Sequence, residues 1–290
     1  MTASFRKFCV IALLLLCPVM AKAQLSPEWR PWNNPVQPVR IIGNIYYVGA
    51  SEVSSFLITT PQGHILIDSG FDETVPLIQA NIKQLGFKLE DVKILLNSHA
   101  HADHAGGLAT LKQLTGAKLF ASKADAELLT NGGKGDFYWD DRLAYKPVKV
   151  DRTFGDKEAV ELGGVKLIAR LTPGHTKGAT TWTLKVKDGD KTYDVVIISS
   201  ASVPGYTLTN NTKYPKIIDD YAYTFKVLKT LPCDIFLAPH GSMFGLLEKQ
   251  ERLKKDAQVN PFIDPQDYRA YIEKAEKTYL QQLEKERQAK

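Results

Sequence analysis

The sequence predicts an α/β fold, and three observations lead to this prediction. Short β-branched runs alternate with segments in which apolar residues recur at helical spacing, as in sheets covered by helices. The composition, with 44% hydrophobic and 24% charged residues among 290, is globular and excludes a disordered, collagenous or disulfide-stapled chain. No low-complexity linker divides the sequence, so we expect a single domain over residues 24–290.

The first 23 residues have the features of a secretory signal peptide. Arg6 and Lys7 give a basic start, residues 9–20 are apolar, and Ala21-Lys22-Ala23 matches an A-x-A cleavage site. The apolar run is shorter than the ~18 residues that a membrane-spanning helix needs. We expect periplasmic export with cleavage after Ala23, which removes three basic residues and lowers the net charge from +5 to +2. A nearly neutral chain gives no electrostatic reason to expect nucleic acid binding.

The first half of the mature chain alternates strands and helices. Two hairpins are expected at the start, with turns at Gly43-Asn44 and at Pro61-Gln62-Gly63. Asp72 is expected to cap the helix that follows, and Gly86 to end it. In order, the expected strands are 41–42, 45–48, 56–59, 65–68, 94–96 and 118–121, and the expected helices are 72–85, 108–114 and 123–129.

The second half repeats this alternation loosely. Its expected strands are 165–171, 180–186, 193–199 and 235–238, with a helix over 221–230. Residues 246–290 are charge-rich and helical, with breaks at Asn260-Pro261 and Asp264-Pro265. Cys233 is the single cysteine after signal cleavage, so it cannot form an internal disulfide, and we expect it to pack as a small hydrophobic residue.

The histidines carry the chemistry. Four residues that can bind zinc, three histidines and one aspartate, occur within the six positions of His99-Ala100-His101-Ala102-Asp103-His104, directly after the apolar strand 94–96. His99 and His101 alternate in an extended segment and can converge on one ion, while Asp103 and His104 can turn toward a second. His175 and His240 lie in loops after two other strands, where α/β sheets build their sites. His64, in a turn, is expected to be an ordinary surface residue.

The His99–His104 segment matches H-x-H-x-D-H, and with Asp68 and the PGHT sequence around His175 it resembles the metallo-β-lactamase superfamily over roughly residues 39–240. The resemblance implies a four-layer αββα sandwich that binds two zinc ions. One ion would be held by His99, His101 and His175, and the other by Asp103, His104 and His240. Asp68 would lie behind the site and orient a ligating imidazole, although it also reads as a strand-end turn residue.

The segment 197–206 separates subgroups of this superfamily. It contains neither the bridging Asp of many superfamily hydrolases nor the ligating Cys of the first lactamase subclass. It is similar to the third subclass of class B β-lactamases, which implies that Ser200 and Ser202 bind the substrate carboxylate and that Tyr206 lies near the substrate carbonyl. Ser199 is the alternative to Ser200 in this assignment. The serines also read as an ordinary turn.

Two further segments resemble features of that subclass. The proline- and tryptophan-rich stretch 29–39 is similar to the N-terminal segment that flanks its site. The insert 131–141 carries Phe137, Tyr138 and Trp139 and resembles a loop along the substrate groove, although such aromatics can equally be packing residues.

The resemblance implies a periplasmic dinuclear zinc β-lactamase that confers antibiotic resistance. It would hydrolyse the amide of penicillins, cephalosporins and carbapenems by a metal-bound hydroxide, with Asp103 orienting the water. We expect a monomer that acts on a small molecule, without nucleic acid or, after signal cleavage, a membrane. The alternatives are a secreted zinc lactonase or thioesterase of the same superfamily, and a non-catalytic binding protein stabilised by zinc.

Overall fold

The structure is a computed structural model, and it describes residues 26–289. The predicted signal peptide, with Cys9, Cys17 and the cleavage point after Ala23, lies outside the described residues. No helix within the described residues is both long and apolar enough to cross a membrane.

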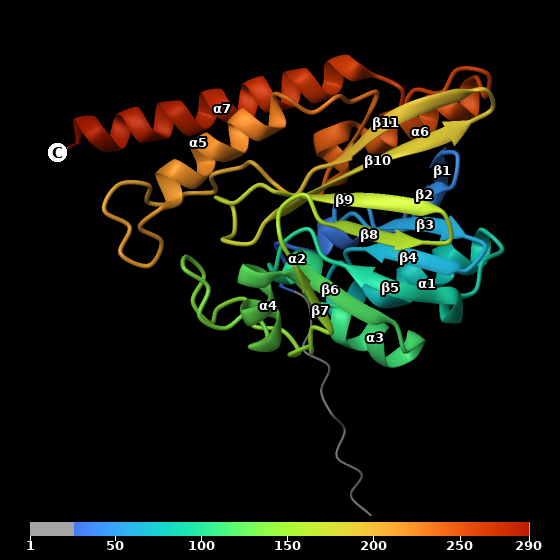
Figure 1. The fold of residues 1–290 in the computed structure, drawn as a ribbon, viewed down its shortest axis with the longest axis horizontal. Coiled ribbons are helices and arrows are strands. Elements are labelled where there is room, and N and C mark those ends of the chain that lie inside the picture. Colours follow the sequence, from blue (N-terminus) through green and yellow to red (C-terminus); the bar gives the residue numbers. More distant parts are fainter. Residues whose placement is uncertain (1–25, 290) are drawn as a thin grey trace, which may run out of the picture.

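Two sheets face each other at the centre of the molecule (Figure 1). The seven-stranded sheet has the order β1-β2-β3-β4-β5-β6-β7; it is antiparallel from β1 to β4 and parallel from β4 to β7. Its strands are β1 (Val39–Ile42), β2 (Ile45–Tyr47), β3 (Phe56–Thr60), β4 (Gly63–Ile67), β5 (Val92–Leu96), β6 (Lys118–Ser122) and β7 (Arg152–Phe154).

The five-stranded sheet has the order β12-β11-β10-β9-β8, and only its β11–β12 pair is parallel. Its strands are β8 (Ala159–Leu162), β9 (Val165–Leu171), β10 (Thr180–Asp188), β11 (Lys191–Ile197) and β12 (Ile235–Leu237).

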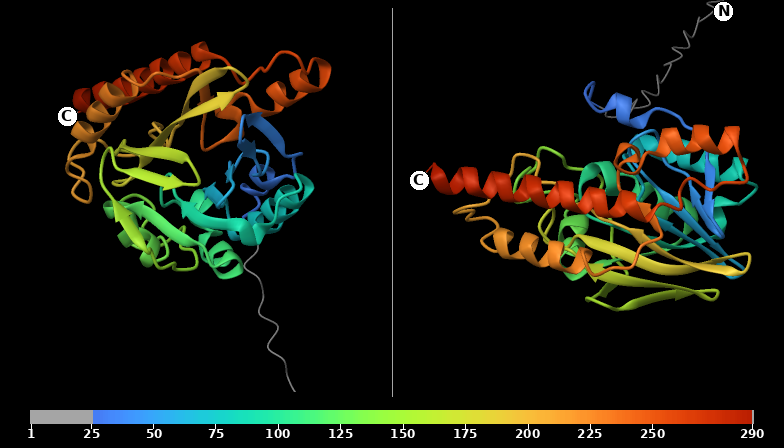
Figure 2. Two further views of the ribbon diagram at one scale, coloured as in Figure 1. Left: turned by 45° about the vertical axis from the view of Figure 1, so that its right-hand side comes forward. Right: turned by 90° about the horizontal axis from the view of Figure 1, so that it is seen from above.

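Helices cover the outer faces of both sheets (Figures 1 and 2). Helices α1 (Val75–Gln84), α3 (Leu108–Thr115) and α4 (Lys123–Thr130) lie on the seven-stranded sheet, and α5 (Ile217–Leu228), α6 (Leu246–Lys255) and α7 (Pro265–Gln288) lie on the other side. The shorter elements are η1 (Arg30–Asn33), η2 (Asp72–Thr74), η3 (Leu89–Asp91), α2 (Ala102–Ala105) and η4 (Gly241–Phe244). The expected four-layer αββα arrangement is confirmed.

The strands β4 and β5 are apolar over residues 65–67 and 94–96, because both faces of the sheet are buried there. Ile65 and Ile67 point into the core between the sheets, whereas Leu66 packs under α1 and α3. Strand β5 repeats this with Leu95 on the helix side. Such two-sided burial is typical of parallel strands covered by helices. It also places Asp68 and Asn97, which follow these two paired strands, at the same sheet edge.

Most predicted elements are present, and two expectations are wrong. Asp72 does not cap α1: it lies in η2, and its carboxylate accepts a hydrogen bond from the Thr110 hydroxyl instead. His64 is buried, with 8% exposure, because it faces inward on β4 and the ring of Phe87 packs edge-on against it at 5.2 Å. The strands β7 and β8 were not expected. Cys233 is half-buried and packs against the core, as predicted.

Candidate metal centre

The predicted ligands come from loops that follow three strands. His99 and His101 lie in the loop after β5, and Asp103 and His104 lie in the single turn of α2. His175 follows β9, and His240 follows β12. Fold topology therefore brings together residues that are up to 141 positions apart in the sequence.

The first cluster consists of His99, His101 and His175. Their ring centroids are 4.8–5.0 Å apart, and one ring nitrogen of each lies within 4.8 Å of the other two. All three side chains are buried. The Nδ1 of His175 lies 3.0 Å from the carbonyl oxygen of Ser202; because a carbonyl only accepts, Nδ1 carries the proton and Nε2 is free to bind a metal.

The second cluster consists of Asp103, His104 and His240. Oδ2 of Asp103 lies 3.1 Å from Nε2 of His104 and 3.5 Å from Nε2 of His240. The two clusters adjoin, since the rings of His99 and His104 are only 4.3 Å apart. The structure thus brings together all six residues that the sequence singled out as metal ligands.

The donor atoms of this centre fit a metal ion. His101 Nε2 and His104 Nδ1 are buried without a hydrogen-bond partner. Burying an unpaired polar atom is unfavourable, and a bound cation would supply the partner that these nitrogens lack in the protein. Imidazole nitrogens and a carboxylate are ligands that zinc accepts readily, and each cluster offers three of them.

Burial also prepares the histidines as ligands. It lowers the pKa of His175 to about 3 and that of His240 to about 4, and it holds the pKa of His99 well below its usual range with the help of His104. These imidazoles are therefore neutral at pH 7 and can bind a metal without losing a proton.

Asp103 and His104 form a coupled pair. Burial opposes the charged form of Asp103, but the charge of His104 and its hydrogen bond outweigh burial and hold the pKa of that carboxyl far below its usual range. Burial likewise opposes protonation of His104, and Asp103 outweighs it, so the pKa of His104 is raised. In the metal-free protein His104 thus favours a proton, which a metal must displace.

Comparison with known proteins places this centre in a family. The model described as the metallo-beta-lactamase superfamily matches residues 48–188. The native FEZ-1 metallo-β-lactamase from Legionella gormanii is 48% identical, with 89% of this chain and 99% of that chain covered and a TM-score of 0.87. The chain belongs to the metallo-β-lactamase superfamily.

Other relatives agree. BJP-1, a subclass B3 metallo-β-lactamase of Bradyrhizobium japonicum, is 38% identical with a TM-score of 0.85, and the match covers 90% of this chain and 99% of that one. The resemblance to the third subclass of class B enzymes is therefore confirmed. A type 2 metallo-β-lactamase of Bacillus cereus is 32% identical over 123 residues, 40% of this chain. That match spans only 46% of the Bacillus protein, so the chain covers under half the length of the curated relatives.

Asp68, which the resemblance predicts to lie behind the metal site, directly follows β4. Its Oδ1 accepts hydrogen bonds from the Ser98 amide at 2.7 Å and from the Asn97 side chain at 3.2 Å. Its Oδ2 lies 4.0 Å from Nδ1 of His104, and burial raises its pKa to about 6. The left-handed backbone of Asp68, with φ of 61°, directs this carboxylate behind the loop of ligands.

The predicted substrate residues have unequal positions. Ser202 lies on the wall of the metal pocket, with its hydroxyl 3.1 Å from that of Ser200. Ser200 is only 4% exposed and lies behind Ser202. Ser199, the alternative to Ser200, is fully buried with its hydroxyl 3.4 Å from Nδ1 of His99.

Tyr206 is placed differently from its expected position near a substrate carbonyl. It is 1% exposed, and its hydroxyl donates to the backbone oxygen of His175 at 3.0 Å. The ring packs against Phe137 and Tyr138 of the insert instead of lining the pocket. In this structure Tyr206 supports the His175 loop, and we correct its assigned role accordingly.

The metal pocket has a volume of about 280 Å³ and aromatic walls. Trp29 stacks on Phe71 at 5.6 Å, and Trp32 packs edge-on against His240 at 5.2 Å, so the N-terminal stretch flanks the ligands as expected. Of the insert aromatics, Trp139 lines this pocket, whereas Phe137 packs into the core. The insert therefore serves both as groove wall and as packing.

Two buried acids beside the ligands were not identified from the sequence. Asp136, in the insert, has its Oδ2 3.6 Å from Nε2 of His101, and its Oδ1 accepts from the amides of Tyr138 and Trp139. Asp125, on α4, is 3% exposed and contacts the backbone of two ligand loops. Neither acid is close to a histidine in the sequence, so no local spacing signals its role.

Proposed function

We propose that residues 24–290 form a single domain that acts as a dinuclear zinc β-lactamase on penicillins, cephalosporins and carbapenems. The observation that carries the proposal is the pair of adjoining three-residue clusters beside Ser202, at the base of one aromatic pocket. Membership of the family and the similarity to FEZ-1 along 99% of that chain support it.

One zinc ion would be held by His99, His101 and His175, and the other by Asp103, His104 and His240. When bound, a zinc pair supplies a water that ionises near neutral pH and positive charge that stabilises the opening amide. The open pocket above the ligands favours catalysis over a purely structural metal, because structural zinc sites are closed by four protein ligands.

The residues around the metals have distinct tasks. Asp103 Oδ2 lies between His104 and His240, and its carboxylate can accept a hydrogen bond that orients a water. The Ser202 hydroxyl, with Ser200 behind it, would donate to the carboxylate of the drug. The aromatic walls of the pocket would pack against the substrate and exclude water from the reacting amide; they are formed by Trp29, Trp32 and Trp139.

The predicted signal peptide supports export to the periplasm, where cell-wall synthesis is the target of these drugs. A secreted enzyme of this kind would confer antibiotic resistance on the cell. We propose that it acts there as a monomer, with small-molecule substrates, and without nucleic acid or membrane contact after cleavage.

The decisive experiment measures hydrolysis of a chromogenic cephalosporin by the purified mature protein, with and without a chelator. A thioester and a lactone serve as competing substrates for the alternative activities of the superfamily. We expect cephalosporin hydrolysis that the chelator abolishes and zinc restores, with far lower rates on the thioester and the lactone. Faster hydrolysis of either of these than of every β-lactam tested would overturn the proposal.

A further inference from the structure

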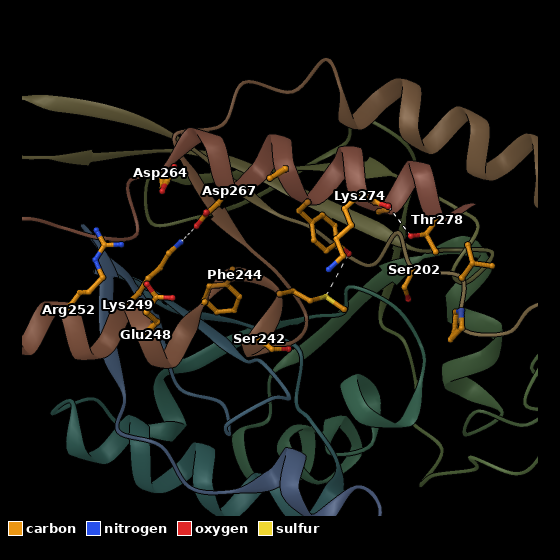
Figure 3. Close-up of a pocket in the computed structure, with 17 residues that line it drawn as sticks. Ser202, Ser242, Phe244, Glu248, Lys249, Arg252, Asp264, Asp267, Lys274 and Thr278 are labelled. Carbon is orange, nitrogen blue, oxygen red and sulfur yellow. Dashed lines mark hydrogen bonds and ion pairs between the residues drawn. The ribbon is translucent and has the colours of Figure 1, made fainter. Parts of the chain in front are cut away.

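A second, larger cavity adjoins the metal pocket. It has a volume of about 770 Å³ and lies between η4 and α6 on one side and α7 on the other (Figure 3). Ser202 and Pro204 line both this α6–α7 cavity and the metal pocket, so the two spaces meet at Ser202.

The sizes of the two spaces indicate that a substrate uses both. Pockets for drug-sized ligands usually have ~300–1,000 Å³, and the metal pocket has only about 280 Å³. A β-lactam with side chains at both ends of its ring system exceeds this volume. If the carboxylate is bound at Ser202, where the two spaces meet, the substituent on the adjacent ring carbon of a cephalosporin or carbapenem would lie at the entrance to the α6–α7 cavity.

The charged residues of the α6–α7 cavity fall into a group at one end and a separate lysine. Lys249 is paired with Asp267, and Figure 3 shows this pair together with Arg252, Glu248 and Asp264 at one end. Lys274 lies apart from them, and its amine points into the cavity. Among the described residues, no carboxylate forms an ion pair with Lys274.

We propose that the α6–α7 cavity extends the substrate site and that Lys274 selects β-lactams with a negatively charged substituent next to the ring carboxylate. The inference rests on the proposed function. Met243, Phe244 and Ala275 give the cavity an apolar wall for the stem of such a substituent. The unpaired ammonium of Lys274 attracts the charge at its end, as cations in partly enclosed clefts do.

The test compares two cephalosporins that share one acyl side chain and differ at the ring substituent, one anionic and one neutral of similar size. We expect Lys274→Gln to lower the ratio of their kcat/KM values by roughly 1.4- to fivefold, since exposed ion pairs are worth ~0.2–1 kcal/mol. Lys274→Glu should lower the ratio further, mainly through KM, and added salt should shrink the effect.

Lys277→Glu is the matched control, because Lys277 is an exposed lysine of α7 that does not line the cavity. An unchanged ratio in Lys274→Glu, or an equal change in Lys277→Glu, would overturn the inference. Wild-type hydrolysis of a simple penicillin separates the two proposals, since a penicillin lacks this substituent. If the wild-type protein does not hydrolyse the penicillin, the proposed function itself fails.

A separate observation concerns Asp125. Its Oδ2 accepts hydrogen bonds from the amide of Ala100 and the hydroxyl of Thr176, both at 3.0 Å, and its Oδ1 accepts from the amide of Gly178 at 2.9 Å. Ala100 lies between His99 and His101, and Thr176 follows His175. One buried carboxylate thus connects the two loops that carry the first metal cluster.

The chain approaches Asp125 so closely that position 178 must be glycine. A Cβ atom there would lie 2.5 Å from Asp125 Oδ1 and 2.2 Å from the Ser122 hydroxyl. All three partners of Asp125 donate, so an amide in its place would bring an N–H group against a donor. We infer that Asp125 is a positioning residue that sets the spacing of His101 and His175 for the first metal ion.

The test measures zinc affinity by chelator competition, separately for the tight and weak ions. Asp125→Asn should weaken binding at the His99–His101–His175 cluster by roughly 10- to 100-fold, as loss of such supporting groups does elsewhere, and affect the second cluster less. Ser122→Ala is the matched control, because Ser122 caps the same helix through the Asp125 amide. It should lower thermal stability but leave both affinities within about twofold. Equal weakening of both clusters by Asp125→Asn, or equal loss of affinity in Ser122→Ala, would refute the assignment.

Discussion

Replacing Ser202 by alanine tests substrate recognition most directly. The Ser202 hydroxyl lines the metal pocket and lies 3.1 Å from the Ser200 hydroxyl. The change removes only Oγ. The backbone oxygen of Ser202 keeps its contacts with His175 Nδ1 at 3.0 Å and with the Tyr221 hydroxyl at 2.6 Å. The loop is thus preserved while the donor to the substrate is lost.

The expected loss follows from this geometry. A hydrogen bond from a hydroxyl to a carboxylate contributes roughly 1.5–3 kcal/mol. Ser200 is almost fully buried and can replace Ser202 only in part, although water entering the open pocket recovers some of the energy. We therefore expect kcat/KM to fall between several-fold and ~100-fold, mostly through KM if the bond is equally strong in ground and transition states.

The assay compares a penicillin with its carboxylate ester. The ester cannot accept the charged hydrogen bond, so Ser202→Ala should cost it little. Zinc content should not change. An equal loss on acid and ester, or a fall in zinc affinity, would show that Ser202 acts by supporting His175, whose Nδ1 lies 3.3 Å from its hydroxyl.

Three further outcomes are expected. Metal analysis should find about two zinc ions per chain, with His175→Ala emptying the first site and His240→Ala the second; full metal content in both variants would contradict the ligand sets. Chelators should abolish activity and clavulanate should not, because no serine is acylated, so inhibition by stoichiometric clavulanate would contradict the mechanism. The metal-free protein should lose stability as the pH falls from 7 to 5: the unfolded chain protonates its histidines near pH 6.5, whereas burial keeps folded His175 neutral down to about pH 3. By linkage, this difference in pKa lowers the free energy of unfolding by ~2 kcal/mol at pH 5. Urea titrations should therefore show that the free energy of unfolding falls less between pH 7 and pH 5 in His175→Gln than in the wild type, by about this amount.

Local patterns in the sequence were sufficient for much of the fold. The hairpins at 39–47 and 56–67 follow from alternating apolar residues around glycine turns, and both are present. Strand β8 was not predicted because it has only four residues and turn residues flank it on both sides, so its apolar pattern is too short to recognise. Asp72 was misassigned because a helix cap depends on where the carboxylate points, and here Thr110 of α3 offers it a partner.

The sequence by itself determined the ligand types, because His99, His101, Asp103 and His104 lie within six consecutive positions and His175 and His240 follow predicted strands. Only the tertiary structure decided how these residues meet, since their distances depend on how β5 of one sheet is placed relative to β9 and β12 of the other. It also assigned Asp125 and Asp136 to the ligand loops and moved Tyr206 behind His175. A motif reports which donor atoms are available, whereas burial and the packing of distant loops decide which of them face the same point in space.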